Sequence, residues 1–137
     1  MLSEGATFID IGAYSSKPNA EFVSVEEELA RIVPVVELLV QQFPTILISI
    51  DTFRSEVAAA CIQKGAALIN DISAGKLDES MLEVIAKYKL PYVMMHMRGN
   101  PQTMSTLTAY EDVVKEVLFY FRPRPKSCQF VRNSKPI

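Results

Sequence analysis

Residues 46–51, Ile-Leu-Ile-Ser-Ile-Asp, form a short apolar run that ends in a carboxylate. Three similar runs occur, over 7–10 ending in Asp10, 67–71 ending in Asn70-Asp71, and 91–96 ending in His96. Each run is too short for a helix, and β-branched and apolar residues predominate, as in strands buried on both faces. Since ligands bind at the carboxyl ends of parallel strands, these polar residues describe one side of an active site.

The segments between the four runs have helical periodicity. We expect strands over about 7–11, 46–51, 67–71 and 91–96, and helices over about 25–42, 55–64, 79–88 and 110–121. This βαβαβαβα order implies right-handed crossovers and a parallel sheet. Two α/β architectures fit it. One is a complete doubly wound sheet of four or five strands, and the other is part of a (β/α)8 barrel, which needs about 250 residues.

Local signals predict where the helices begin and which faces they bury. Two pairs have the spacing of a capping box, Ser24 with Glu27 and Thr108 with Glu111. Asp78 is the expected cap of the third helix. Pro34 should kink the first helix or divide it in two. In and after that helix we expect a solvated start at Glu26–Glu28 and a core formed by Val35, Leu38, Leu39 and Phe43.

Composition indicates one soluble globular domain. The chain has 137 residues, of which 49% are hydrophobic and 22% charged, and its net charge of −2 gives no reason to expect nucleic acid or a membrane as partner. No stretch has the form of a membrane span or a signal peptide. Cys61 and Cys128 match no metal or redox spacing, and Cys61 is most simply a core residue. We therefore expect a cytoplasmic protein.

The charge is spread unevenly along the chain. Of the fourteen basic residues, five lie within 122–137, a segment with three prolines and no acid, which leaves nine against sixteen acids in the rest. We therefore expect a domain over 1–121 and a basic, proline-containing tail over 122–137 that is disordered or unrelated to it.

Four segments together resemble the dihydropteroate synthase family. Residues 10–18, Asp-Ile-Gly-Ala-Tyr-Ser-Ser-Lys-Pro, are similar to its Asp-Ile-Gly-Gly-Glu-Ser-Thr-Arg-Pro signature. Three others match further family segments in order and spacing, Ser-Ile-Asp-Thr at 49–52, Leu-Ile-Asn-Asp-Ile-Ser at 68–73 and Met-His-Met-Arg-Gly-Asn-Pro-Gln-Thr-Met at 95–104. Each match is weak alone, but the set is highly specific and covers residues 5 to about 121.

The resemblance implies a (β/α)8 TIM barrel, of which this chain supplies about four consecutive βα units. It also implies an enzyme that joins 6-hydroxymethyl-7,8-dihydropterin pyrophosphate to p-aminobenzoate, giving 7,8-dihydropteroate and pyrophosphate for folate synthesis. Sulfonamides compete with the aminobenzoate in this family. The small-molecule substrates are the implied partners, Mg²⁺ is the implied cofactor, and a homodimer in which a second copy completes the barrel stays open.

The resemblance also assigns roles to residues. Asp51 and Asn70 would hold the pterin edge, because a carboxylate accepts two N–H donors and an amide both donates and accepts. Met95 would pack on the pterin ring, and His96 would line the pyrophosphate side. The implied p-aminobenzoate loop is Ser15, Ser16, Lys17 and Pro18. The implied catalytic residues are Asp10, Ser16 and Lys17, with Asp10 organising the loop and contacting Mg²⁺-pyrophosphate.

Simpler interpretations exist for several of these residues. Asp51 could be only the cap of a helix that starts near Phe53, and Asn70 could be a loop amide. His96 alone is more often a satisfied imidazole at a strand end. Asp71 is expected to be structural, because neighbouring residues in a strand point to opposite faces and Asn70 already faces the centre.

The chain departs from the family at its loop and its ends. Lys17 replaces the usual Arg, which keeps the charge but loses the planar fork. The family strand that carries the Mg²⁺-linked Asn would precede Met1, so we expect no metal ligand within 1–137. The pterin lysine and the Arg-x-His anion site would follow Phe121. We therefore expect a truncated chain that is inactive alone.

Two other functions fit part of the pattern. A methyltetrahydrofolate methyltransferase domain shares the Asp and Asn logic, but the loop 15–18 and the Met-His-Met segment argue against it. A non-catalytic small α/β binding module would need a glycine-rich phosphate-binding turn, and Gly12-Ala13-Tyr14 is not one.

Overall fold

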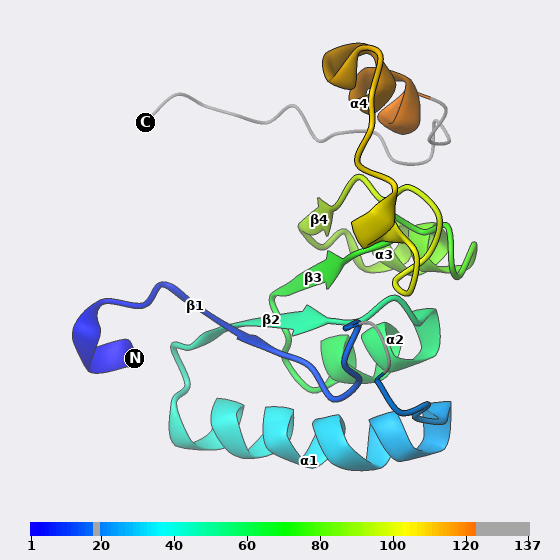
Figure 1. Cartoon of the computed structure of the whole chain (residues 1–137). Helices are drawn as coiled ribbons and strands as arrows, with labels where there is room; N and C mark the ends of the chain where they lie inside the picture. The colour runs from blue at the N-terminus through cyan, green and yellow to red at the C-terminus, as the bar shows by residue number, and fades with distance from the viewer. Residues whose placement is uncertain (18–19, 123–137) are drawn as a thin grey trace.

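The computed structural model describes residues 1–17 and 20–122 (Figure 1). Pro18 of the predicted loop and residues 123–137 of the predicted tail lie outside the described residues. The strands are β1 (Phe8–Ile11), β2 (Leu47–Asp51), β3 (Leu68–Asp71) and β4 (Tyr92–Met94). The α-helices are α1 (Val25–Gln42), α2 (Ser55–Gln63), α3 (Met81–Tyr88) and α4 (Val113–Phe121), and Leu2–Glu4 and Met104–Thr106 form single 3₁₀ turns.

Strand order decides between the two predicted architectures. The four strands are parallel and lie in sequence order, β1-β2-β3-β4. A doubly wound sheet reverses its strand order at a switch point, because its helices cover both faces. Here each unit continues in the same direction, and α1 packs on α2 and α2 on α3 along one face (Figure 1). The chain therefore has the α/β fold of the TIM-barrel family, with four consecutive βα units in the described residues.

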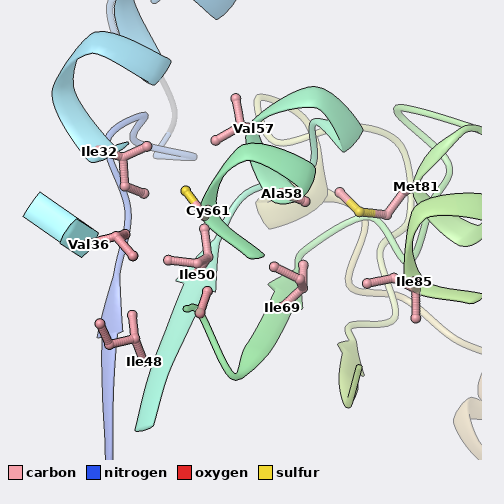
Figure 2. Close-up of a cluster of buried hydrophobic side chains, with 11 residues drawn as sticks. Ile32, Val36, Ile48, Ile50, Val57, Ala58, Cys61, Ile69, Met81 and Ile85 are labelled. Atoms are coloured by element: carbon pink, nitrogen blue, oxygen red, sulfur yellow. The ribbon is translucent and has the colours of Figure 1, made fainter. Parts of the chain in front are cut away.

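The core lies between the sheet and the helices (Figure 2). Ile48 and Ile50 of β2 and Ile69 of β3 are fully buried against side chains from three helices, among them Val36, Val57, Cys61 and Met81. Cys61 is fully buried, as predicted, and burial together with the charge of Glu28 raises the pKa of its thiol to about 12. It is a packing residue with no reactive thiolate at neutral pH.

The other face of the sheet is open. Side chains alternate along a strand, so the residues that face away from Ile48, Ile50 and Ile69 share the second face. Its apolar members Phe8, Leu47, Val93 and Met95 are exposed. In a closed barrel this is the inward face, which opposing strands cover.

Several helix predictions need correction. Helix α4 begins at Val113, because Asp112 rather than the Thr108–Glu111 pair accepts the capping hydrogen bond, from the Lys115 N–H at 3.0 Å. Asp78 Oδ1 accepts the Ser80 N–H at 3.0 Å, the local bond expected of a cap at 78, but α3 begins only at Met81, with Ser80 in the N-cap position. Asp78 Oδ2 also accepts the Ser55 N–H at the start of α2, at 2.6 Å.

Helix α1 also differs from expectation. It runs unbroken through Pro34, so the predicted division in two is wrong, and Ser24 caps it by accepting the Glu27 N–H at 3.1 Å. Its fully buried apolar residues are Ile32 and Val36, whereas three of the predicted core residues, Val35, Leu38 and Phe43, are exposed. Apolar residues of α1 lie on several sides of the helix, so their periodicity did not single out the face that meets the sheet. No helix within 1–17 and 20–122 is both long and apolar enough to cross a membrane.

Candidate functional site

A cavity of about 870 Å³ opens at the carboxyl ends of β1 and β2. Its volume lies within the range of about 300–1,000 Å³ that is usual for small-molecule sites. Five of the predicted site residues line it, Asp10, Ser15, Ser16, Lys17 and Asp51. They come from the ends of two strands and from the β1–α1 loop, so the fold brings together residues that are up to 41 positions apart in sequence.

Asp51 is the last residue of β2 and is not a helix cap. Helix α2 begins at Ser55 with Arg54 as its N-cap residue, so the simpler interpretation of Asp51 is wrong. Its side chain makes no hydrogen bond within the described part of the chain. Partial burial raises the pKa of the Asp51 carboxyl, and the negative charges of Asp10, Asp71 and Glu28 add to the effect. The carboxylate is thus held at the cavity at an electrostatic cost that a ligand with N–H donors would relieve.

Asn70 lies beside Asp51, because the two are register partners in the pairing of β2 with β3. Register partners in parallel strands point to the same face, here the open one. Met95 follows β4 and is also partly exposed, while its backbone N–H donates to the Asp71 carbonyl at 3.2 Å. Asn70 and Met95 lie outside the cavity lining, which ends at Asp51 on this side.

Asp71 faces the helices and is fully buried, as the strand alternation predicted. Its carboxylate accepts hydrogen bonds from the Ser73 N–H (2.7 Å), the Ser73 hydroxyl (2.8 Å), the Gly75 N–H (2.8 Å) and the Tyr92 hydroxyl (2.6 Å). These bonds tie the β3–α3 loop to β4. Asp71 therefore supports the edge on which Asn70 lies.

The loop after β1 comes close to β2 at Gly12. A Cβ atom on Gly12 would lie 3.0 Å from the Asp51 carbonyl oxygen and 3.2 Å from the Asp51 Cβ, so a larger residue fits only if Asp51 moves by a few tenths of an ångström. Beyond it, the Lys17 N–H donates to Ser15 Oγ at 3.3 Å, and Arg31 of α1 donates to the Ala13 carbonyl at 3.3 Å. The described part of the loop is thereby placed at the rim of the cavity.

The sequence analysis did not identify two residues that lie behind the cavity, Glu28 and Arg54. Glu28, expected in a solvated helix start, is only 1% exposed and pairs with Arg54, with 2.7 Å between Oε2 and Nη1. Glu28 lies four residues before Ile32 and eight before Val36 and therefore shares the buried face of α1, which the apolar periodicity of this helix did not single out. The partner, 26 residues away in sequence, had no local signal.

His96 lies apart from this cavity. It lines a second hollow of about 460 Å³ with Lys76, Arg98 and Tyr120, and its ring meets that of Tyr120 edge-on, 4.7 Å between centroids. Within the described residues, no group of three or more His, Cys, Asp or Glu side chains is arranged to hold a metal ion.

Comparison with known proteins gives the class of the molecule. The family described as pterin binding enzyme matches residues 1–131, and the chain therefore belongs to the pterin-binding enzyme family. Among curated relatives, the mitochondrial folate synthesis bifunctional protein of Pisum sativum is 53% identical over 85% of the chain. The dihydropteroate synthases of Synechocystis and Escherichia coli are 47% and 44% identical over 88% and 94% of it. The resemblance to dihydropteroate synthases is thus confirmed.

Solved structures agree with this placement. The dihydropteroate synthase of Yersinia pestis, solved with a sulfonamide drug complex, is 43% identical over 88% of the chain with a TM-score of 0.82. That of Xanthomonas albilineans, solved with 4-aminobenzoic acid, is 41% identical over 87% of the chain with a TM-score of 0.75. The chain spans 43% and 41% of these two structures, and 24%, 42% and 45% of the three curated relatives.

Proposed function

We propose that this chain forms the pterin- and p-aminobenzoate-binding side of a dihydropteroate synthase. The observation that carries the proposal is the register pairing of Asp51 with Asn70 beside a cavity that Ser15, Ser16 and Lys17 line. Support comes from relatives that are dihydropteroate synthases, including one from Xanthomonas albilineans that was solved in complex with 7,8-dihydropteroate.

The donor and acceptor pattern fits one edge of a pterin. Asp51 supplies acceptor oxygens for two ring or amine N–H groups, and Asn70 supplies one donor and one acceptor next to them. Met95, partly exposed on the same side of the sheet, supplies a polarizable surface for the ring. The raised pKa of Asp51 favours this role, since N–H donors would stabilise its ionised form.

The remaining site residues act on the other reactants. Loss of pyrophosphate leaves an electrophilic methylene that the amine of p-aminobenzoate attacks. Lys17 would neutralise an anionic reactant, and Ser15 and Ser16 would offer hydroxyls to it. Asp10 stands at the base of this loop, at the same cavity. Closing the loop would exclude water from the reactive methylene.

Magnesium is the proposed cofactor, within limits set by the donors present. Mg²⁺ commonly binds one or two carboxylates together with substrate phosphates, and Asp10 is a carboxylate at the cavity that is not assigned to the pterin. Asp10 would therefore contact a cation that pyrophosphate holds, and the described residues form no cage for the ion by themselves. Such a cation would stabilise the negative charge of the leaving group.

Domain extent, assembly and location are further proposals. We propose one domain over 1–121, supported by a connected core whose residues run from Ile11 to Tyr92. The exposed apolar side chains on the open face of the sheet favour self-association, so we propose a homodimer, which sedimentation of the purified chain would detect as twice the monomer mass. We also propose a cytoplasmic location, which cell fractionation would test.

Binding tests the proposal directly, without depending on turnover. Calorimetric titration with 6-hydroxymethylpterin should give a saturable isotherm for the wild type, with affinity reduced about tenfold or more in Asp51→Ala. Asp112→Asn serves as the control, because it changes a carboxylate that caps α4 and stays compatible with the cap. Equal affinity of wild type and Asp51→Ala would refute the pterin site.

A further inference from the structure

One guanidinium group lies behind the cavity among three aromatic rings. The Cζ atom of Arg54 is 4.8 Å from the ring centroid of Tyr14, 5.7 Å from that of Phe22 and 5.6 Å from that of Phe53. Tyr14 also contacts both other rings, with centroids 6.3 and 5.6 Å away. The planar cation therefore meets aromatic side chains from both ends of the β1–α1 loop.

The guanidinium nitrogens of Arg54 also bind helix α1 and the β1–α1 loop through hydrogen bonds. Nη1 donates to Glu28 at 2.7 Å, and Nη2 donates to the Val23 carbonyl at 2.7 Å. Glu28 is held in turn by the Thr52 hydroxyl at 2.8 Å, and Thr52 Oγ1 accepts the Arg54 N–H at 3.2 Å. The two terminal nitrogens, Nη1 and Nη2, thus have separate partners, one on helix α1 and one on the loop.

This arrangement connects two segments that are distant in sequence. Tyr14 and Val23 flank the part of the loop that carries Ser15, Ser16 and Lys17, and Tyr14, Phe22 and Val23 also line the cavity. Arg54 follows β2 and begins α2. In Figure 1 the blue connection from β1 to α1 lies beside the start of α2, which agrees with these contacts.

We propose that Arg54 is a positioning residue that holds both ends of the β1–α1 loop, and so places Ser15–Lys17 at the cavity. An ion pair with Glu28 would need only one nitrogen. The second nitrogen and the planar face are directed at Val23, Tyr14 and Phe22, which a purely structural pair would not require. Lysine offers neither the fork nor the flat face, so Arg54→Lys should keep the ion pair and lose the hold on the loop.

Hydrogen exchange tests whether Arg54 orders the β1–α1 loop, and it needs no ligand. In Arg54→Lys, backbone amides of the described loop residues should exchange about tenfold faster or more, while amides of β2 and β3 stay as in the wild type. The matched control is Arg98→Lys, because Arg98 also lies over a tyrosine ring, 4.7 Å from that of Tyr110, pairs with Glu116 and donates to a carbonyl. It should leave loop exchange unchanged. Unchanged exchange in Arg54→Lys, or equal acceleration throughout the chain, would overturn the proposal.

A binding measurement then tests whether the positioning of the loop by Arg54 matters for p-aminobenzoate binding. This second experiment rests on the proposed function. With 6-hydroxymethylpterin present, Arg54→Lys should weaken p-aminobenzoate binding about tenfold and leave the pterin affinity unchanged. Equal loss of both affinities would reduce Arg54 to a structural residue. If the wild type binds neither compound, the proposed function fails, while the exchange experiment still decides whether Arg54 positions the loop.

Discussion

Asp51 and Asn70 are register partners at the carboxyl end of the sheet, while the next residue of β3, Asp71, points into the core on the opposite face. The three polar residues at the ends of these two strands are thereby divided into a ligand-facing pair and a structural acid. The cause is strand alternation, which sends neighbours to opposite faces and register partners to the same face. Mutations should separate these roles.

Replacing Asp51 with Asn should increase stability at pH 7 and weaken pterin binding. Its pKa is raised in the folded chain by burial and by nearby acids, so the ionised form opposes folding above that pKa. We expect the Tm of Asp51→Asn to exceed that of the wild type by a few degrees at pH 7. The difference should shrink as the pH falls toward 3.8, the ordinary carboxyl value, because both states of the wild type then become protonated. A wild type that is more stable than the variant at pH 7 would contradict this.

Replacing Asp71 with Ala should destabilise the fold strongly. Four donors, including the Tyr92 hydroxyl and the Gly75 N–H, would lose a buried charged acceptor. We expect a loss of about 3 kcal/mol or more in the free energy of unfolding, and about 1–2 kcal/mol for Tyr92→Phe, which removes one donor. Urea denaturation measures both, and a loss below that of Tyr92→Phe would be inconsistent with the network.

Replacing Gly12 with Ala should shift Asp51 and so weaken pterin binding. The Cβ of Gly12→Ala would meet the backbone and Cβ of Asp51 at 3.0–3.2 Å, so β1 and β2 must separate. We expect a stability loss of about 1–3 kcal/mol and weaker pterin binding. Thermal melting and calorimetry check the two effects, and binding that survives unchanged would show that Asp51 does not depend on this close approach.

Changing Lys17 tests whether charge or shape matters in the loop. Lys17→Ala should weaken p-aminobenzoate binding about tenfold, whereas Lys17→Arg should keep or improve it, because arginine adds a bidentate fork. Lys64→Ala is the control, since Lys64 is a half-exposed lysine that pairs with Glu37 and lies outside the cavity lining. Equal affinities for Lys17→Ala and the wild type would remove Lys17 from the site.

The strand and helix pattern was predictable because it rests on local periodicity. The four apolar runs became β1 to β4, and Asp71 faced the core as alternation required. Helix ends were less predictable. Asp78 accepts the local Ser80 N–H just before α3, but it also accepts the Ser55 N–H of α2, and no local pattern contains a contact between residues 23 positions apart.

By itself, the sequence determined the order of βα units, the family and the residues at each strand end, because periodicity and motif spacing are properties of neighbouring residues. Only the tertiary structure decided that the strands lie in sequence order with their helices on one face, and that Glu28 is buried against Arg54. The order of strands in the sheet and the pairing of buried charges both depend on which distant segments pack together. That is set by the packing of the whole fold and not by local sequence.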